Sequence, residues 1–560
     1  MERDANRNGE YGMERRDFLK AATLIGAVAA SGGMLAGCAP KSASEARNES
    51  AAAVSGRVDP SSVKWDFETD VIVVGSGSGG TCAAIEAAEA GAEVIIFEKN
   101  EAMYGGNSAL CGGYMLAAGW STQEELTGYA GDTGEAFADQ MLRWAQGQGN
   151  QEMIREACLR SGEAVDWMIS TGRTYEGASP LAPVWSCGDT EADIVPRSVY
   201  NHNAYGATEG HMATLKKRID SLSNVQVEMG CEVAHLLQNE EGAVIGVQLA
   251  DGAFAKARKG VVMACASVDN NLEMSKDLGL MQNVWGMALE GAGMASPNNP
   301  DMDTNTGDGV RMLREIGADL LLQQAVCMND MMYVGGVSDW GMSEALGKEV
   351  NLYDSTNLDA ILVDRTGRRF CQDDAVWGYV VHECAQAAWR QGFNPDDPAT
   401  GYIWYVYDAA GAPFFEIKGH TPDSCETTFS SDTVEGLADH IGCDPAALAS
   451  EVEKWNSFCE AGIDADFGRR ANLAPIATPP FYCDVVRPGP MGTFAGAKSN
   501  VKAEIMGLDG NPIPRLYGAG CIIGGNYSGP FYVGCGWSIT NTVVWGREAG
   551  KNVAALDSWE

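Results

Sequence analysis

VIVVGSGSGG, residues 71 to 80, decides the fold of this 560-residue chain. Four apolar, β-forming residues stop at Gly75, where a glycine-rich turn begins. The residues that follow, Thr81 to Ala90 (TCAAIEAAEA), are rich in Ala and Glu and predict a helix. A second strand is expected over Glu93 to Phe97, ending at Glu98. This order predicts a β-α-β unit of the kind that binds dinucleotides.

Each glycine of the turn has a physical role in such a unit. The first, Gly75, makes the tight turn, and Gly77 lets the pyrophosphate approach the helix N-terminus. Gly80 lets helix and strand pack closely, and Glu98 is placed to accept hydrogen bonds from ribose hydroxyls. The alternative is a purely structural turn at the end of a buried strand. The cofactor contacts expected from this segment are Gly75, Gly77, Ser78, Gly79, Gly80 and Glu98.

Composition limits the class of protein. Hydrophobic residues make up 45% and charged residues 21%, as in an ordinary globular protein with two or three domains. The net charge is −37 and no basic block is present, so the sequence offers no phosphate-neutralising surface and predicts no nucleic-acid partner. The same acidity would suit docking to a basic protein such as a cytochrome.

The N-terminus predicts export. Arg15-Arg16 opens a twin-arginine pattern, and an apolar run follows from Ala21 to about Ala36. Leu35 to Cys38 resembles a lipoprotein cleavage box, so residues 1–38 are interpreted as a signal with Cys38 as the lipidated first residue. The alternative is an uncleaved apolar anchor, which also places the folded body outside the cytoplasm and on the membrane. Residues 39–65 are expected to form a flexible tether.

The 16 cysteines are scattered, with no C-x-x-C spacing and no haem-attachment motif. A disulfide framework and a covalently attached c-type haem are therefore not expected. The spacing shows no iron–sulfur site, although the fold could still bring ligands together.

Beyond Glu98 the chain resembles a flavoprotein family that contains fumarate reductases, urocanate reductases and 3-ketosteroid dehydrogenases. The resemblance rests on segments along nearly the whole chain: Gly105 to Ser108, Cys111 to Gly113, Val244 to Ala266, Thr306 to Gly309, Ile361 to Phe370, Leu516 to Gly520 and Gly536 to Ser538. It implies non-covalently bound FAD. The further cofactor contacts that it implies are Lys99, Gly105, Gly106, Asn107, Ser108, Gly112, Gly113, Val233, Asp308, Gly520, Ser538 and Ile539.

The same resemblance implies an α/β fold in two parts. A discontinuous, Rossmann-like FAD-binding domain is expected from residues 66–320 and 476–560, with an α+β substrate or capping domain inserted over 321–475. Two positions depart from the family pattern, because Cys521 replaces a usual Glu and Ala266-Ser267 replaces Gly-Gly.

Fumarate reductases bind a dicarboxylate through arginine and histidine side chains. At the corresponding places this chain has other residues, namely Trp377, Ala325-Val326-Cys327, Val533 and Met491-Gly492. We therefore expect a substrate other than a small dicarboxylate.

The 3-ketosteroid dehydrogenase branch matches better, through Tyr532 and Gly536 in YVGCG. That branch uses a Tyr hydroxyl and a Gly N–H to polarise an enone carbonyl, so that hydride can pass between flavin N5 and the β-carbon. The alternative is that Tyr532 only covers the flavin. Tyr333 and Tyr379 are candidate proton donors, or else buried aromatics, and His382 is interpreted as a core histidine.

An exported flavoenzyme cannot rely on NADH, so we expect reduction of an apolar α,β-unsaturated carbonyl with electrons from a cytochrome. Within the family the chain looks most similar to the cardiac glycoside reductase branch, through its signal, length, cysteine content and the stretch around Tyr333. That branch implies the unsaturated lactone of cardenolides as substrate, a membrane-associated multihaem cytochrome c as partner and a [4Fe-4S] cluster, which no spacing supports. The alternatives are a 3-ketosteroid dehydrogenase, a fumarate-, urocanate- or hydroxycinnamate-type reductase, and an electron-relay flavin lipoprotein.

Overall fold

A computed structural model describes residues 56–180, 189, 191–201, 210–289, 304–322, 326–330, 359–375, 377–417, 420–486, 488–534 and 536–559. All of them belong to one compact unit, Ala52–Glu560. Among these residues, no helix combines the length and the apolar character that a membrane span requires.

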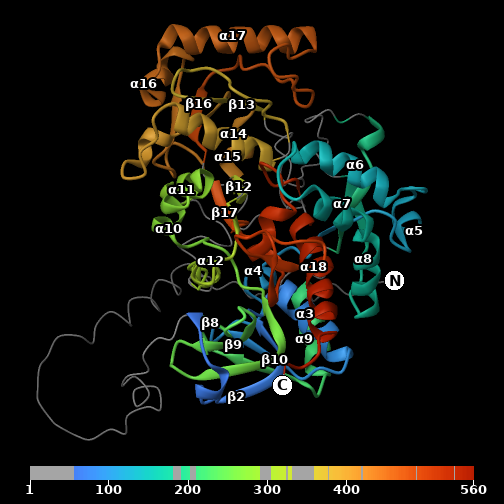
Figure 1. Cartoon of the computed structure of the whole chain (residues 1–560). Coiled ribbons are helices and arrows are strands. Elements are labelled where there is room, and N and C mark those ends of the chain that lie inside the picture. Colours follow the sequence, from blue (N-terminus) through green and yellow to red (C-terminus); the bar gives the residue numbers. More distant parts are fainter. Residues whose placement is uncertain are drawn as a thin grey trace, which may run out of the picture. The chain divides into compact units, whose positions relative to one another are not determined.

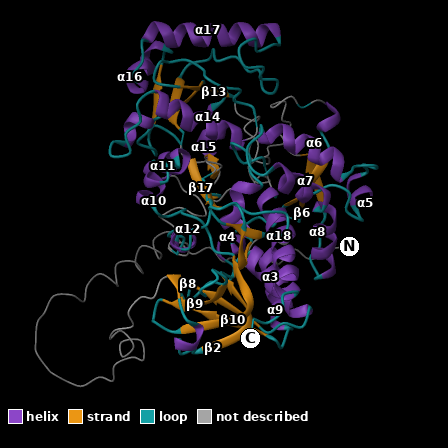
Figure 2. Ribbon diagram, viewed as in Figure 1, coloured by secondary structure: helices purple, strands orange, loops and turns teal. Residues whose placement is uncertain are grey.

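A mixed sheet forms the base of the described chain (Figures 1 and 2). Its order is β1-β8-β9-β10-β2-β3-β7, with β20 also beside β10 and β19 beside β20. Strands β20, β10, β2, β3 and β7 run parallel to their neighbours in this set, so their carboxyl ends share one edge of the sheet, where α/β proteins bind ligands. The strand bounds are β1 Gly56–Arg57, β2 Phe67–Val74, β3 Val94–Glu98, β7 Val225–Met229, β8 Val233–Gln238, β9 Val244–Leu249, β10 Phe254–Met263, β19 Glu504–Met506 and β20 Pro512–Gly518.

Helix α3 (Ser78–Glu89) follows β2, and the C-terminal helix α18 (Trp537–Ala554) packs beside it (Figure 2). Two glycines of α18 make this contact close. A Cβ atom on Gly546 would lie 2.4 Å from the Gly79 carbonyl oxygen, and one on Gly550 would lie 2.3 Å from the Ala83 carbonyl oxygen. Because only glycine permits this approach, α18 is fixed against α3. Thr542 of α18 then reaches Ser78 in the glycine-rich turn.

Further helices follow in the same unit, of which α9 packs on α3 and α12 packs on β8 of the large sheet. In α6, Phe137, Met141 and Trp144 are all buried, at the spacing of one helical face. The helix bounds are α4 Gly106–Ala109, α5 Gln123–Thr127, α6 Gly134–Ala145, α7 Gln151–Leu159, α8 Ser161–Ser170, α9 His211–Asp220, α10 Leu272–Asp277, α11 Met281–Ala288 and α12 Asp308–Glu315. A small sheet beside α6 to α8 has the order β4-β6-β5, from Met115–Leu116, Pro196–Tyr200 and Gly177–Pro180.

The inserted region contains an antiparallel sheet of order β13-β14-β16-β15. Its strands are β13 Ala360–Val363, β14 Trp404–Tyr407, β15 Thr428–Ser431 and β16 Phe481–Val485. Its helices are α14 Trp377–Arg390, α15 Ala412–Ile417, α16 Ala438–Ile441 and α17 Pro445–Ala461. Two short ribbons, β11 (Leu320–Leu321) with β18 (Gly496–Ala497) and β12 (Val326–Asp330) with β17 (Pro488–Thr493), connect it to the rest. The described chain thus has the expected α/β sheet with an inserted α+β region.

Two expected boundaries differ in the structure. The tether was predicted to reach residue 65, but Gly56–Arg57 already pairs with Leu237 and Gln238 of β8, and Val58 is buried. This end of the predicted tether is wrong because its backbone completes the edge of the sheet. The second part of the FAD-binding domain was expected from residue 476, yet β16 lies after that point and sits between β14 and β15 of the inserted sheet.

Candidate active site

A pocket lies at the carboxyl edge of the large sheet, between the starts of α3 and α12 and the 3-10 segment Gly520–Asn526. Among its lining residues are the predicted contacts Gly75, Gly77, Ser78, Gly79, Glu98, Lys99, Gly106, Asn107, Ser108, Val233, Asp308 and Gly520. Gly80, Gly105, Gly112, Gly113, Ser538 and Ile539 were also predicted, and they are not among the described residues that line it. The sequence analysis missed the lining residues Ser76, Asn305, Thr306 and Thr542.

The glycine-rich turn has the geometry of a phosphate cradle. Gly75 has a φ of +102°, and a Cβ atom there would lie 2.8 Å from the Ala264 carbonyl oxygen. A Cβ on Gly80 would lie 2.1 Å from the Gly75 carbonyl oxygen, so both positions exclude a side chain. A Cβ on Gly77 would meet no protein atom closer than 3.8 Å. The room beside Gly77 therefore opens into the pocket, as a bound pyrophosphate requires.

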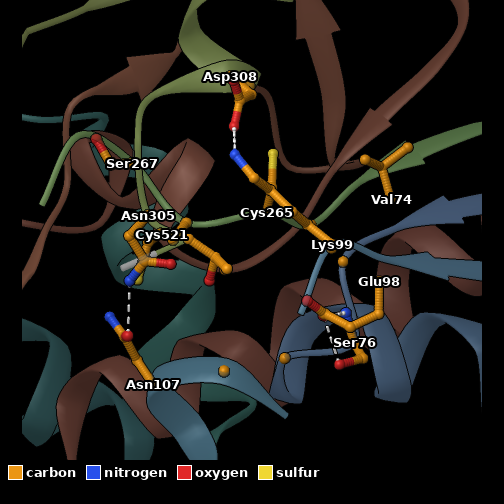
Figure 3. A pocket seen from close by; sticks show the side chains of 18 of the residues that line it. Val74, Ser76, Glu98, Lys99, Asn107, Cys265, Ser267, Asn305, Asp308 and Cys521 are labelled. Atoms are coloured by element: carbon orange, nitrogen blue, oxygen red, sulfur yellow. Dashed lines mark hydrogen bonds and ion pairs between the residues drawn. The ribbon is translucent and has the colours of Figure 1, made fainter. Parts of the chain in front are cut away.

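Glu98 holds this turn in place. Its Oε2 accepts hydrogen bonds from the Ser76 N–H at 2.9 Å and the Ser76 hydroxyl at 2.6 Å, and its Oε1 accepts from the Asn100 N–H at 2.8 Å (Figure 3). The Ser76 hydroxyl oxygen in turn accepts the Gly105 N–H at 2.8 Å. Glu98 thus joins the two glycine-rich segments, in addition to lining the pocket where a ribose would lie. The role of Ser76 could have been suspected from its place between the first two glycines.

We expect Glu98→Gln to lower the free energy of unfolding by about 1–3 kcal/mol and to weaken FAD binding, because an amide group cannot accept all three of these hydrogen bonds. Thermal unfolding and flavin fluorescence titration measure both effects. Glu93→Gln is the matched control, since Glu93 is exposed just before the same strand. Equal behaviour of the two variants would contradict this role for Glu98.

The far end of the pocket carries a paired cation. Lys99 Nζ lies 2.8 Å from Asp308 Oδ2 and donates a hydrogen bond to the Thr306 hydroxyl at 3.0 Å, and Glu232 lies 3.6 Å away (Figure 3). Lys99 is the only lysine or arginine among the described residues that line the pocket. Its charge is balanced by carboxylates, so this end suits polar ribose and adenine groups better than an anion.

At the opposite end, a buried aspartate anchors two asparagines. Asn305 donates a hydrogen bond to Asn107 Oδ1 at 2.8 Å (Figure 3). It also donates to Asp269 Oδ2 at 3.1 Å. The Thr493 N–H donates to the other oxygen of Asp269. Burial raises the pKa of Asp269 to about 6, although these hydrogen bonds oppose the shift. The network fixes the Asn107 amide, whose Nδ2 has no hydrogen-bond partner among the described residues.

A raised pKa gives Asp269 a defined effect on stability. From pH 3.8 to about 6 the folded protein keeps a proton on Asp269 that the unfolded chain loses. The free energy of unfolding that this group contributes therefore falls as the pH rises. We expect Asp269→Asn to gain about 3 kcal/mol of unfolding free energy relative to the wild type between pH ~4 and ~7. Denaturant unfolding across this range measures the difference. The exposed Asp439→Asn should show none, and a flat Asp269→Asn difference would contradict the burial of this charge.

A buried polar chain supports the first turn of α3. The Thr542 hydroxyl donates to Ser78 Oγ at 2.8 Å, and Ser78 Oγ lies 2.8 Å from His211 Nε2. Burial, and then the charge of Arg173, lowers the pKa of His211 to about 3, so His211 is neutral at pH 7 and shares a hydrogen bond with Ser78. The sequence analysis missed His211 and Thr542 because they lie far from the glycine motif in the sequence.

The predicted carbonyl-binding pair lies at the start of α18. Tyr532 is buried, and its hydroxyl oxygen accepts the Ser538 N–H at 3.0 Å. Gly536 precedes the helix with a φ of +95°, and a Cβ there would lie 2.6 Å from the backbone of Met115. The ring of Tyr532 stacks on Phe494, with centroids 5.7 Å apart. The structure therefore brings Tyr532, Gly536 and Ser538 together at one helix N-terminus.

Of the other residues considered in the sequence analysis, Tyr379 and His382 lie in the described part of the chain. Tyr379 lies in the first turn of α14, and its ring contacts Phe531 edge-on at 5.5 Å. A Cβ on the neighbouring Gly378 would lie 1.9 Å from the Tyr532 carbonyl oxygen, so α14 packs directly on the Tyr532 segment. His382 is half-buried, and its Nδ1 lies 2.6 Å from the Gln282 side-chain nitrogen. Tyr333 lies outside the described residues.

The expected [4Fe-4S] cluster also stays a prediction. The side chains of Cys38, Cys187, Cys327 and Cys535 lie outside the described part of the chain.

Comparison with known proteins agrees with this site. Residues 70–539 match the family described as FAD binding domain. Digoxin reductase of Eggerthella lenta is 82% identical over 560 residues, covering 100% of both chains. Urocanate reductase of the same organism is 26% identical over 511 residues, covering 87% of this chain and 75% of that one.

Solved structures share the fold. The 3-ketosteroid-Δ4-(5α)-dehydrogenase of Rhodococcus jostii RHA1 superposes with a TM-score of 0.69 at 23% identity, covering 90% of this chain and 100% of that one. An open flavocytochrome c3 fumarate reductase gives a TM-score of 0.60 at 25% identity, covering 88% and 78%. The glycine cradle, the open space at Gly77 and the amide of Asn107 fit the cofactor that the family binds. The chain therefore belongs to the FAD binding domain family and is an FAD-dependent oxidoreductase.

Proposed function

We propose that this chain is an exported reductase of the C=C bond in an apolar α,β-unsaturated carbonyl, with the lactone of a cardenolide such as digoxin as its substrate. The observation that carries the proposal is the position of Tyr532, Gly536 and Ser538 at the N-terminus of α18. The 82% identical relative, named for digoxin reduction, supports this choice of substrate.

The chemistry of these groups suits an enone. A helix N-terminus favours negative charge, and a phenol that accepts the Ser538 N–H is a better donor of its own hydrogen. Tyr532 would donate to the substrate carbonyl oxygen, where negative charge develops as the β-carbon gains hydride. FAD, when bound, supplies that hydride. Tyr379, or Tyr333 outside the described residues, would then protonate the α-carbon.

A dicarboxylate substrate has less support. The residues at the family's arginine and histidine positions include Val533, which is buried and apolar. A valine at such a position cannot pair with a carboxylate, so it favours an uncharged substrate.

Export and the electron donor rest on the sequence. The twin-arginine pattern and Cys38 lie outside the described residues, and the proposed donor is a membrane-associated cytochrome c that docks on the acidic protein. Mass spectrometry of the membrane-bound protein would detect a lipid on Cys38. Recovery of a full-length, unmodified chain from the cytoplasm would contradict export.

A substrate panel tests the reaction. The FAD-loaded protein, kept anaerobic with reduced viologen, is given digoxin, fumarate, urocanate, a hydroxycinnamate or a 3-ketosteroid enone. We expect digoxin to gain two hydrogens and the others to react at least about 100-fold more slowly. Turnover of fumarate at the same rate would contradict the proposal. Oxidation of a saturated 3-ketosteroid, with the dye as electron acceptor, would instead favour the hypothesis that the protein is a 3-ketosteroid dehydrogenase.

A further inference from the structure

A second polar cluster lies in the inserted domain, apart from the residues that line the FAD pocket. Its centre is Asp484 in the middle of β16, which pairs with Tyr405 of β14 on one side and Thr428 of β15 on the other. The Asp484 side chain has no exposed surface. A buried carboxylate in a sheet is costly unless its charge is compensated, so its partners are informative.

Two groups contact this carboxylate. The Thr428 hydroxyl donates to Oδ1 at 2.8 Å, and His420 Nδ1 lies 2.5 Å from Oδ2. Within the described chain, neither a lysine nor an arginine pairs with Asp484. Among the described residues, His420 is therefore the group that could supply a positive charge to Asp484, and His420 is itself buried.

Cys425 completes a set of three donors. One ligand atom from each of His420, Cys425 and Asp484 lies within 4.8 Å of the other two. Burial opposes ionisation of Cys425, but hydrogen bonding with Thr427 and Thr428 outweighs it, and the pKa of Cys425 is lowered. Every other described cysteine with a resolved shift has a raised pKa. The thiolate is the form of cysteine that binds metals.

An unpaired hydroxyl beside the cluster points to an occupant. Tyr407 is 1% exposed, and its hydroxyl has no hydrogen-bond partner among the described residues. It lies two residues from Tyr405 in β14, so it faces the same side of the sheet as Asp484. Burial, followed by the charges of groups that include Asp484 and Cys425, raises the pKa of Tyr407. A buried hydroxyl of this kind calls for a partner that the described side chains do not provide.

We propose that His420, Cys425 and Asp484 bind a zinc ion, with water as the fourth ligand and the Tyr407 hydroxyl bonded to that water. Thiolate, imidazole and carboxylate are the donor types that Zn²⁺ accepts in tetrahedral sites. Nitrogen and oxygen ligands of such a site lie about 3.3 Å apart. His420 and Asp484 would therefore separate by about 0.8 Å to admit the ion.

This ion would tie the segment that carries His420 and Cys425 to β16, which returns the chain to the FAD-binding domain (Figure 1). Binding would release the thiol proton of Cys425 and any proton on His420. Its role is then structural support of the inserted domain, independent of which substrate the flavin site reduces.

The test uses the FAD-loaded protein and zinc at concentrations set by a chelator. We expect one zinc per chain by elemental analysis, and a zinc absorption spectrum with one sulfur ligand near 2.3 Å and nitrogen or oxygen ligands near 2.0–2.1 Å. Cys425→Ser and Asp484→Asn should each weaken zinc binding at least about 100-fold, since even the loss of a supporting group costs up to that much. Cys443→Ser is the matched control, because Cys443 is a half-buried cysteine of the same domain outside the cluster.

Folding is checked separately. Zinc should raise the melting temperature of the wild type and of Cys443→Ser but not that of Cys425→Ser, while FAD content stays equal in all three. The proposal is overturned if the wild type takes up no zinc, if Cys425→Ser binds it as tightly as the wild type, or if the bound metal has only sulfur ligands.

Discussion

Tyr532→Phe is expected to lower kcat for lactone reduction by about 10²–10³-fold while FAD stays bound, the cost of losing one donor to the developing negative charge. The ring would keep its stacking on Phe494, so the change removes only the hydroxyl. Anaerobic steady-state kinetics with digoxin measure kcat and KM separately. We expect the effect in kcat, because the hydrogen bond strengthens as the charge forms.

Tyr402→Phe provides the control. Tyr402 is a half-buried tyrosine of the inserted domain that contacts Trp404 and does not line the FAD pocket. Its loss should leave kcat within about twofold of the wild type. A Tyr532→Phe variant with wild-type kcat would show that Tyr532 only covers the flavin.

Gly77→Val is expected to give a folded protein that has lost FAD. Gly77 has a φ of −56°, which valine can adopt, and no protein atom lies within 3.8 Å of the new Cβ. The added methyl groups would instead occupy the space of the pyrophosphate at the start of α3. We expect the FAD dissociation constant to rise by at least about tenfold, equivalent to 1.4 kcal/mol. Flavin fluorescence titration of the cofactor-free protein measures it.

Gly80→Val separates this effect from loss of the fold. Its Cβ would collide with the Gly75 carbonyl oxygen at 2.1 Å, so this variant should lose both stability and FAD. Circular dichroism and thermal unfolding distinguish the two variants. If Gly77→Val binds FAD as the wild type does, the pyrophosphate does not lie at this turn.

The sequence alone predicts the FAD half of the site well, because its signal is local. The predicted strand and helix around the turn became β2 (Phe67–Val74) and α3 (Ser78–Glu89). Val244 to Ala266 likewise contains the antiparallel pair β9 and β10. In each case the pattern of a short stretch of sequence predicts its secondary structure, and the family resemblance predicts the same elements.

The rest depends on contacts between distant segments. Asp269 is held by Thr493 and Asn305, and His211 meets Ser78 across 133 positions of sequence. No periodicity marks such residues as partners. The segment Ile361 to Phe370 also depends on a distant partner, because β13 pairs with β14 and a turn follows β13.

The most direct test of the account is a single-turnover measurement. The FAD-loaded protein is reduced with two equivalents of a one-electron-reduced viologen dye per flavin under anaerobic conditions, and flavin reoxidation is followed after mixing with digoxin or with its saturated-lactone derivative. The account predicts fast reoxidation by digoxin, with the saturated lactone as product, and none by the derivative. Reoxidation by neither compound, or by fumarate in place of digoxin, would contradict it.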